Sequence, residues 1–388
     1  MAIANLYLIG EDGVLLRNLP LLFNQQKFNI NFIGSKKSVF RGEKNFLEIK
    51  VARNLTFIQA LLADVQLVKS INGLVIIGTD AEMREIAESD LPLELKLNLL
   101  PSKSPNFLDI YDSKIGFERI CNLLNVKKPN SRVVKNSADL NSACTELRFP
   151  LLAKKDRGSG GIGVAEIKNN RDLRSLKLTP ADFPFLLEEK ITGEEVGVEA
   201  FYRDGRLLGY LYSKSTGSIY HQGPSYICSY QIPDKTDFFN DLESIGSLTN
   251  LTGMVNCSFI LDSISGNHFI FEFDPRPNAW HFLANELGLD ISDLYSNPNY
   301  VVQTTDLITT NFVKLDRYIF FLAKTTSISR SILEIIGLSK SQLVLIGGTG
   351  KLIYSTFNKF ILLFYRLISR KPFYSSPAKF QNLVRNFR

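Results

Sequence analysis

The chain has 388 residues, of which 45% are hydrophobic and 22% charged; this composition supports a packed core and excludes global disorder. Its four cysteines form no C-x-x-C pair and its three histidines no H-E-x-x-H pattern, which argues against a disulfide scaffold and a histidine-built zinc enzyme. Residues 311–388 contain 13 basic and 2 acidic side chains, whereas residues 1–310 contain 32 and 37. The net charge of +6 therefore comes from the tail and does not indicate nucleic-acid binding by the whole chain. The scattered cysteines fit a reducing compartment, and we expect a cytoplasmic protein.

Alternating strand and helix patterns open the chain and predict a small parallel sheet with helices on its faces. No cationic, apolar signal stretch precedes the first strand. Strands are expected at residues 2–10, 28–33 and 73–78, and helices at 14–24 and 55–71. Pro101 and Pro105 interrupt the pattern, so we expect this first α/β domain to cover residues 1–110.

From Tyr111 the pattern changes to many short strands, which predicts an α+β domain with antiparallel hairpins over residues 111–310. Helices are expected at 113–124 and 138–148, and strands at 150–155, 163–167, 185–191, 195–202, 207–213, 225–231, 254–262 and 268–274. We divide this domain into subdomains at about 130–195 and 196–310. The basic tail, residues 311–388, is expected to be helical throughout.

A glycine-rich segment, Gly158-Ser159-Gly160-Gly161-Ile162-Gly163, formally matches G-x-G-x-x-G. In a dinucleotide-binding fold this motif must open a helix, whereas here strand-like residues both precede and follow the loop. The order strand, glycine loop, strand predicts a β-hairpin flap, whose backbone N–H groups are suited to covering phosphates. The alternative is an ordinary mobile hairpin turn, which the glycines taken alone favour.

Charged residues on both sides of the flap favour the phosphate hypothesis. Lys154 lies on the preceding strand, where it would meet phosphates from beside the loop, and the extended segment 187–195 offers backbone to an adenine edge and carboxylates to ribose. Glu272 and Asp274 are two residues apart on a strand, so both project from one face, as oxygen ligands for Mg²⁺ would. Arg276 follows in a proline-stiffened turn, where it would hold a phosphate or carboxylate. For each acid taken singly, a solvated strand face is the alternative.

Taken in order, these segments resemble the ATP-grasp superfamily over about residues 111–295, and most closely its carboxylate–amine ligase and carbamoyl-phosphate-synthase-like branch. The matching motifs are Asp112-Ser-Lys114, Phe149-Pro-x-x-x-Lys154, the flap, Glu188-x-x-Ile191-x-Gly-x-Glu195, and Glu272-x-Asp274-Pro-Arg276. The resemblance implies an ATP-grasp fold. It would comprise an N-terminal parallel α/β pre-ATP-grasp domain, a flap-bearing and a metal-bearing subdomain, and a basic helical C-terminal extension.

The resemblance also implies roles: two lysines and the flap for the phosphates, one strand end for adenine and ribose, and two carboxylates for Mg²⁺ or Mn²⁺. In that order the residues are Lys114, Lys154, Gly158, Ser159, Gly160, Gly161 and Gly163, then Glu188, Lys190, Ile191 and Glu195, then Glu272 and Asp274. Lys154 and Arg276 are the implied catalytic cations. Lys214 and His221, expected in a loop after the strand at 207–213, are weaker candidates for phosphate contact.

Two positions depart from the family pattern. The family usually has asparagine where Asp274 stands, but aspartate is also an oxygen ligand. On the partner strand the family has an acid or glutamine where the spacing places Ser258, a poor ligand. Asp262 is four residues further along, roughly 13 Å at ~3.3 Å per residue, too far to replace it. A second metal would therefore be bound weakly or through water.

The resemblance implies an ATP- and Mg²⁺-dependent ligase that activates a small-molecule carboxylate as an acyl phosphate for attack by an amine. Two alternatives stay open. One is carbamoyl-phosphate-type carboxylate phosphorylation, although the chain is too short for both ATP-grasp halves of that synthase. The other is a non-catalytic ATP-binding module with a degraded metal site, which Ser258 favours.

Three further features of the sequence have both a functional and a structural interpretation. The segment 347–351 hints at a P-loop but lacks its first glycine and its Ser or Thr, so a plain turn is favoured. Trp280 and His281 either line an acceptor pocket or begin a helix that packs on the sheet. His268 is expected to be structural.

Residues 351–374 mix large apolar side chains with five basic ones and no acid, and their longest uncharged run is too short to span a bilayer. A basic amphipathic helix on an anionic membrane is one hypothesis, which would place the protein peripherally at the inner face of a membrane. The alternative is a helix packed on the body of the protein. No nucleic-acid partner is expected.

Overall fold

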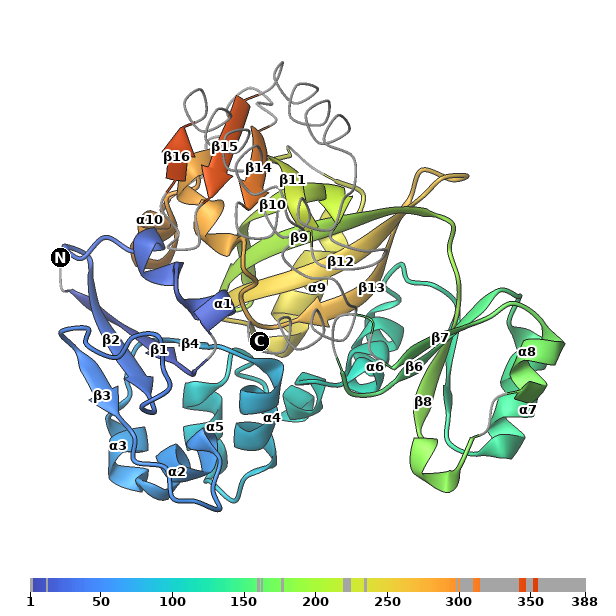
Figure 1. The fold of residues 1–388 in the computed structure, drawn as a ribbon, viewed down its shortest axis with the longest axis horizontal. Coiled ribbons are helices and arrows are strands. Elements are labelled where there is room, and N and C mark those ends of the chain that lie inside the picture. The colour runs from blue at the N-terminus through green and yellow to red at the C-terminus, as the bar shows by residue number, and fades with distance from the viewer. Residues whose placement is uncertain are drawn as a thin grey trace, which may run out of the picture.

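The computed structural model describes residues 3–300, except 12, 159, 160, 162, 176, 177, 219–224, 234, 235 and 298, together with three later strands that are named below. Figure 1 shows an N-terminal sheet at the lower left, a large sheet in the centre and a small sheet at the lower right. Among the described residues, no helix is both long enough and apolar enough to traverse a bilayer.

The N-terminal sheet is parallel, with the strand order β3-β2-β1-β4. Its strands are β1 (Ala4–Ile9), β2 (Phe28–Gly34), β3 (Phe46–Glu48) and β4 (Leu74–Ile77). Its helices are α1 (Gly13–Leu16), the 3-10 helix η1 (Leu19–Leu22), α2 (Phe57–Ala63), α3 (Val65–Ser70), α4 (Asp80–Glu88) and α5 (Leu93–Leu99). The three predicted strands and their parallel arrangement are confirmed.

The two predicted helices of this unit are shorter than the sequence pattern indicated. The stretch 14–24 forms only α1 and η1, because Pro20 has no backbone N–H for a continuous helix. The stretch 55–71 is divided at Asp64, whose side chain accepts a hydrogen bond from Leu67 N and so begins α3 instead of extending α2. Helices α4 and α5 have no counterpart among the predicted elements.

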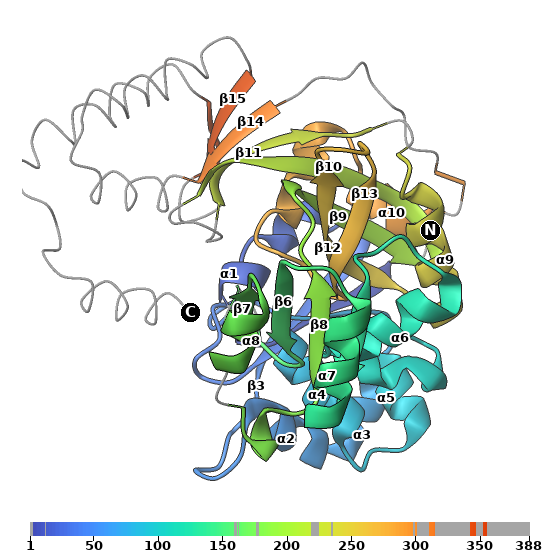
Figure 2. The ribbon, with the colours of Figure 1, turned by 90° about the vertical axis from the view of Figure 1, so that its right-hand side faces the viewer.

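The small sheet is antiparallel, with the order β5-β8-β6-β7. The preceding helices are η2 (Pro105–Ile110) and α6 (Lys114–Leu124). The elements of this unit are β5 (Ser131–Val134), α7 (Ser137–Glu146), β6 (Leu151–Lys155), β7 (Val164–Ile167), α8 (Asn170–Ser175), η3 (Pro180–Asp182) and β8 (Phe185–Glu189). Figure 2 views this sheet below the long strands of the large one. Its core joins Leu140 of α7 to Leu151 and Leu187.

The large sheet has the order β13-β12-β9-β10-β11-β14-β15-β16. Its elements are β9 (Gly193–Arg203), β10 (Arg206–Ser218), β11 (Ser225–Gln231), α9 (Phe239–Thr249), β12 (Gly253–Asp262), β13 (His268–Asp274), η4 (His281–Leu283), η5 (Asn285–Leu287), α10 (Ile291–Ser296), β14 (Thr310–Lys314), β15 (Gln342–Ile346) and β16 (Leu352–Tyr354).

The expectation that the tail is helical throughout is wrong, because β14, β15 and β16 are strands. Strand β14 pairs with β11 and so extends the edge of the large sheet. Short apolar runs such as those of β15 do not distinguish a helix from a strand by periodicity, and pairing with an available sheet edge decides between them.

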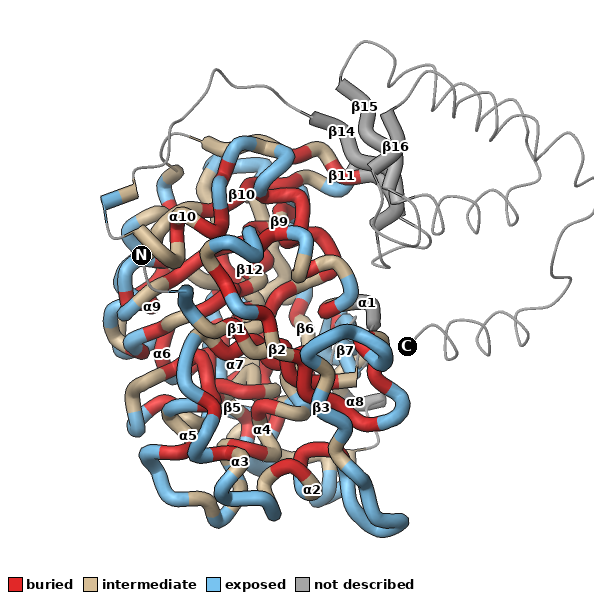
Figure 3. The backbone as a smooth tube through the Cα atoms, turned by 90° about the vertical axis from the view of Figure 1, so that its left-hand side faces the viewer, coloured by how far each residue is buried: buried red, intermediate tan, exposed pale blue. Residues whose placement is uncertain are grey.

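Aromatic contacts fix α6 and α9 to one face of the large sheet. Phe117 of α6 stacks on Phe273 of β13 with ring centroids 5.3 Å apart, and Phe238, just before α9, stacks on Phe259 of β12 at 4.3 Å. The opposite face packs against η4 and the N-terminal unit, in a second core that includes Leu8 and Phe201. Figure 3 shows buried backbone running through β9, β10 and β12.

The connection at residues 101–105, whose prolines interrupt the first sequence pattern just before the predicted domain boundary at residue 110, is hydrogen-bonded to the large sheet's unit. Ser102 Oγ donates to Thr249 O at 2.8 Å, and Thr252 N donates to Pro101 O at 2.9 Å. This segment therefore holds the N-terminal unit against the C-terminal end of α9.

Candidate nucleotide and metal site

Lys154 and Glu188, two residues that the sequence assigned to a nucleotide, form an ion pair on neighbouring strands of the small sheet. Leu152 lies opposite Glu188 and Lys154 opposite Leu186, so Lys154 and Glu188 are diagonal neighbours on one face. Lys154 Nζ lies 2.6 Å from Glu188 Oε1, and each side chain is only 6% exposed. Burial raises the pKa of Glu188, and the charge of Lys154 opposes this rise.

The hairpin β12–β13 carries the predicted metal ligands. Asn256 lies opposite Asp274 and Ser258 opposite Glu272, so both acids project from one face, as predicted. The next pair joins Phe259 to Ile270, which leaves Phe271 as the extra residue of a β-bulge.

The bulge brings the metal-bearing strand to the small sheet. Lys154 Nζ lies 5.0 Å from the centroid of the Phe271 ring, within range of a cation–π contact. Lys154 and Glu272, which come from different sheets, therefore share one site.

The charge on Glu272 is incompletely balanced by the protein. Burial and the neighbouring Asp274 raise the pKa of Glu272 to about 7, although Lys114, Arg276 and Lys154 oppose the rise. A divalent cation would supply the missing positive charge. Mg²⁺ commonly takes one or two carboxylates together with substrate phosphates, so Glu272 and Asp274 fit it.

The departures from the family pattern hold in the structure. Ser258 Oγ donates to Glu272 Oε2 at 3.4 Å, which leaves the partner strand without a carboxylate at this position. Asp262 instead accepts hydrogen bonds from Ser265 in the hairpin turn. Within the described residues, no three or more Asp, Glu, His or Cys side chains cluster as a metal cage.

The flap is a hairpin between β6 and β7, as the sequence predicted, and its first strand is anchored to α6. Ser113 Oγ caps α6 at Gly116 N and donates to Asp156 Oδ1 at 2.9 Å. Lys114 Nζ donates to Gly158 O at 2.7 Å. Lys114, at the first turn of α6, thus lies at the base of the flap.

The described flap glycines have backbone conformations that favour glycine. Gly158, Gly161 and Gly163 have φ values of +123°, +77° and +82°. Ser159, Gly160 and Ile162 lie outside the described residues.

Arg276 is not free to hold a substrate group in the way that the sequence suggested. Its guanidinium forms ion pairs with Asp80 and, at 2.7 Å, with Asp274 Oδ2, and its side chain is 12% exposed. Burial and the charge of Asp274 raise the pKa of Asp80 to about 7. Asp80 is not among the predicted site residues, although its place after β4 was a signal, since ligands bind at the carboxyl ends of parallel strands.

Two buried polar residues further extend the site beyond the predicted set. Glu199 of β9 is 1% exposed and accepts hydrogen bonds from Asn278 Nδ2 at 2.7 Å and Tyr230 OH at 2.9 Å. Burial raises the pKa of Glu199 to about 7. Asn278 also donates to Asn256 Oδ1 at 2.7 Å, which links Glu199 to the residue opposite Asp274. An acid inside the apolar strand at 195–202 was the signal that could have revealed Glu199.

The prediction for Lys214 is wrong. Lys214 lies within β10 and not in a loop, opposite Val196 of β9. Val196 belongs to the core on the face covered by α6 and α9, so Lys214 is on the face opposite Glu272. Its Nζ lies 2.6 Å from Glu194 Oε2. His221 is outside the described residues, as is the segment 347–351.

The remaining nucleotide candidates lie at the junction of β8 and β9. Lys190 N donates to Pro150 O at 2.9 Å, and its Nζ donates to Glu166 at 2.8 Å. Glu195 is exposed and pairs with Ile260, on the same face of β9 as Glu199. Ile191 follows Lys190 in the short connection between β8 and β9.

The two histidines of the described part are structural. His281 is fully buried beside Phe201, with ring centroids 5.4 Å apart, which confirms packing on the sheet over a pocket-lining role. His268 Nδ1 lies 2.6 Å from Asp237, and its other ring nitrogen lies 3.2 Å from Tyr212 OH.

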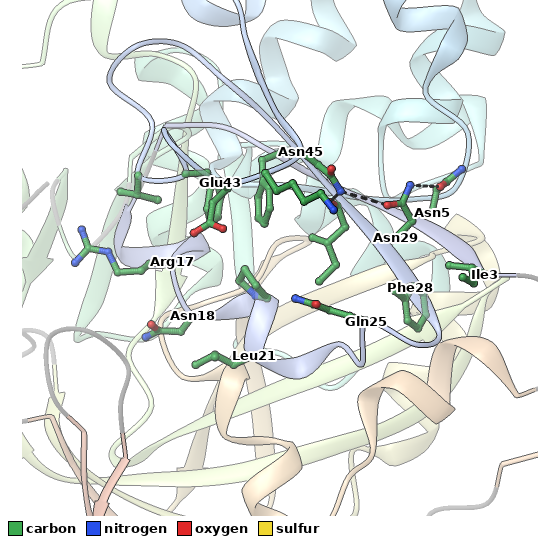
Figure 4. Close-up of a pocket in the computed structure, with 16 residues that line it drawn as sticks. Ile3, Asn5, Arg17, Asn18, Leu21, Gln25, Phe28, Asn29, Glu43 and Asn45 are labelled. Carbon is green, nitrogen blue, oxygen red and sulfur yellow. Dashed lines mark hydrogen bonds between the residues drawn. The ribbon is translucent and has the colours of Figure 1, made fainter.

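A separate hollow of about 760 Å³ lies on the N-terminal sheet beside η1 (Figure 4). Several amide side chains line it, and Asn5, Asn29 and Asn45 form a hydrogen-bonded chain across the strands. None of the residues assigned above to a nucleotide or metal is part of this lining.

No protein-family profile matches the chain. In sequence, an alignment 202 positions long, which covers 49% of the chain, is 20% identical to the multifunctional protein pyr-3 of Neurospora crassa. The matched part is 11% of that protein, so the chain corresponds to a small part of this relative.

Solved structures resemble the chain over most of its length. They include phosphoribosylamine–glycine ligase from Thermotoga maritima (TM-score 0.56, 14% identity, 77% of this chain and 78% of that one). N5-carboxyaminoimidazole synthetase from Staphylococcus aureus, complexed with ADP, has a TM-score of 0.55 and 14% identity, with 78% and 80% covered. The biotin carboxylase domain of Hydrogenobacter thermophilus 2-oxoglutarate carboxylase, with MgADP and bicarbonate, has a TM-score of 0.56 and 12% identity, with 78% and 71% covered.

Proposed function

We propose that this chain, which has the ATP-grasp fold, is an ATP- and Mg²⁺-dependent ligase that activates a carboxylate as an acyl phosphate for attack by an amine. One observation carries the proposal: the bulge at Phe271 joins Lys154 of the small sheet to the strand that bears Glu272 and Asp274. A phosphate-binding cation and a pair of metal-binding carboxylates thus face a common site, as phosphoryl transfer requires.

Glu272 and Asp274 would hold Mg²⁺, and the same pair would accept Mn²⁺. When bound, the metal would neutralise phosphate charge and orient the transferred group. Ser258 cannot add a carboxylate, so the protein supplies few ligands and the nucleotide phosphates would complete the coordination.

The chain's own residues would position the nucleotide. Lys114 and Lys154 approach from the base of the flap and from β6, where they would neutralise the phosphates while the flap excludes water. Glu188 would contact adenine together with the carbonyl of Lys190 and the backbone of Ile191, since Lys190 N–H is used within the small sheet.

The contacts in the site leave the proposed role of Glu195 as it was and change that of Arg276. Glu195 remains the candidate for the ribose because of its exposure on the active face. Arg276 would act through Asp274, since its guanidinium is divided between two carboxylates.

The substrate class follows from the proposal and from the names of the similar structures. One of these is a ligase for phosphoribosylamine and glycine, and another holds MgADP and bicarbonate. We infer a small-molecule carboxylate and an amine for this chain as well.

ADP release from ATP tests the proposal when carboxylates and amines are supplied in pairs and the products are detected by mass. We expect at least one pair to stimulate ADP release and Glu272→Ala to lower that rate by about 100-fold or more. Glu243→Ala, which removes an exposed carboxylate of α9, is the matched control and should retain full activity. A fully active Glu272→Ala variant would defeat the metal assignment.

Ser258 favours a second candidate, a non-catalytic ATP-binding module. Such a protein would bind ATP in calorimetry but would release no ADP with any substrate pair. Carbamoyl-phosphate-type activity would instead appear as ADP release with bicarbonate and ammonia alone.

Contact of residues 351–374 with an anionic membrane remains part of the proposal; this segment lies almost entirely outside the described residues. We expect the full chain to sediment with vesicles that contain phosphatidylserine more than with pure phosphatidylcholine vesicles. Replacing Arg366, Arg370 and Lys371 by glutamine should abolish the difference, and equal sedimentation of both proteins would sink this part of the proposal.

A further inference from the structure

Helix α4 presents one charged face to the proposed nucleotide site. Asp80, Arg84 and Glu88 are spaced four residues apart and lie along one side of the helix. Met83 and Ile86 are buried in the core next to this side. The capping box of Thr79 and Glu82 fixes where the helix begins and therefore where Asp80 stands.

Each of the three residues contacts a different segment of the site. Asp80 pairs with Arg276, two residues after the metal ligand Asp274. Arg84 pairs with Asp112, which has a φ of +55° and stands two residues before Lys114.

Glu88 makes the third contact. Its Oε1 accepts a hydrogen bond at 2.8 Å from Arg157 Nη2, and Arg157 is the residue before Gly158 of the flap. One helix of the N-terminal unit thus contacts the metal strand, the start of α6 and the base of the flap. In Figure 1, α4 lies between the N-terminal sheet and α6.

The three ion pairs differ in how far they are exposed to solvent. The side chains of Asp80 and Arg276 are 15% and 12% exposed, and those of Arg84 and Asp112 are 24% and 18% exposed. Arg157 and Glu88 are both 57% exposed, and such solvated pairs contribute little free energy. The two less exposed pairs, of Asp80 with Arg276 and of Arg84 with Asp112, are therefore the ones able to hold the site in one geometry.

The division of Arg276 between two carboxylates has a consequence for the metal. Nε of Arg276 donates a hydrogen bond to Asp80, so that Asp274 receives a single hydrogen bond from the guanidinium, from Nη2 at 2.7 Å. Without the charge of Asp80, both Nε and Nη2 of Arg276 would hydrogen-bond to Asp274, since a guanidinium and a carboxylate favour bidentate pairing. Arg276 would then compete with a cation for Asp274.

We propose that Asp80 and Arg84 of α4 are positioning residues of the nucleotide site: Asp80 keeps Asp274 available to the metal by holding Arg276, and Arg84 places Lys114 by holding Asp112. This inference rests on the proposed function, because it takes Asp274 as a metal ligand and Lys114 as a phosphate contact.

Calorimetric titration with ADP, in EDTA and in Mg²⁺, tests the two roles separately in the full chain. For Asp80→Asn, we expect the gain in ADP affinity that Mg²⁺ brings to fall by about tenfold or more, with the affinity in EDTA nearly unchanged. For Arg84→Gln, we expect the affinity in EDTA to fall by about tenfold. Glu88→Gln, on the same helix face, is the matched control. It removes only the ion pairs of an exposed carboxylate, with Arg157 and, at 3.8 Å, with Arg84, and should change neither value by more than about twofold.

An undiminished Mg²⁺ effect in Asp80→Asn, or an equal loss in Glu88→Gln, would overturn the inference. If Asp80→Asn does not unfold cooperatively on heating, it is not properly folded and its titration is set aside. The ADP affinities of Arg84→Gln and Glu88→Gln in EDTA then decide, and equal affinities of these two variants would overturn the inference. No ADP binding by the unsubstituted chain would overturn the proposed function itself.

Discussion

At the scale of single residues, three cations of the proposed site already have protein partners, and two of them, Lys154 and Arg276, are largely buried. Lys154, Lys114 and Arg276 each contact a protein acceptor: Glu188, the carbonyl of Gly158, and the carboxylates of Asp80 and Asp274. Nucleotide binding would therefore exchange partners of these cations. Removing one member of such an ion pair leaves the other buried without its counter-charge, which lowers the free energy of unfolding.

The pair of Lys154 and Glu188 gives the clearest test of this cost. Lys154→Met would leave Glu188 buried without its cation, so we expect the free energy of unfolding to fall by about 3–5 kcal/mol. The double variant Lys154→Met/Glu188→Leu should recover much of this loss, because no buried charge remains. Urea denaturation of the single and double variants measures both values, and a Lys154→Met loss below about 1 kcal/mol would contradict the account.

Glu272 makes stability depend on pH in a predictable direction. Its pKa in the folded protein is raised from 4.5 to about 7, so the unfolded chain loses this proton first and the fold weakens as pH rises between these values. Asp80 and Glu199 act in the same direction.

In EDTA, the stability lost between pH 5 and pH 8 should be smaller in Glu272→Gln than in the unsubstituted chain, by about 1–3 kcal/mol. Mg²⁺ should restore part of the lost stability at pH 8 in the unsubstituted chain only. Urea denaturation at the two pH values checks this, and identical pH dependence of the two proteins would refute it.

At the scale of elements, the first turn of α6 links helix capping to the nucleotide site. Ser113→Ala removes the cap on Gly116 N and the hydrogen bond to Asp156, so we expect a loss of about 1–2 kcal/mol in stability. Lys114 would lose its fixed position, so ADP affinity should also fall. Ser137→Ala, a substitution in the first turn of α7 that leaves the Asn136 cap in place, is a suitable control. Unchanged ADP binding by a destabilised Ser113→Ala would show that the cap serves only the fold.

The strands that form the site could be predicted from the sequence, because alternation of apolar and polar residues determines which side chains share a face. This is how Glu272 and Asp274 were placed together, whereas Ser258 on the partner strand was identified by its spacing in the family pattern. Lys214 was misplaced because β10 continues past the apolar run from which its end was judged. Helices α4 and α9 were not predicted, and the tail strands depend on a sheet edge that no local pattern reveals.

At the scale of the whole molecule, the contacts that complete the site join distant parts of the chain. Asp80 and Arg276 are 196 positions apart, and Tyr230 meets Glu199 from another strand of the large sheet. No periodicity or motif links such residues, since their meeting depends on how the N-terminal unit is held against the large sheet. Ser102 and its hydrogen bond to Thr249 contribute to that arrangement.

In the proposed function, the small sheet and the β12–β13 hairpin together bind one nucleotide with a divalent cation. Isothermal titration of the pure full chain with ATP and Mg²⁺ tests it most directly. We expect saturable heat for about one nucleotide per chain, and we expect EDTA and Glu272→Ala each to weaken the binding. The absence of any binding heat, or heat that neither EDTA nor Glu272→Ala diminishes, would contradict it.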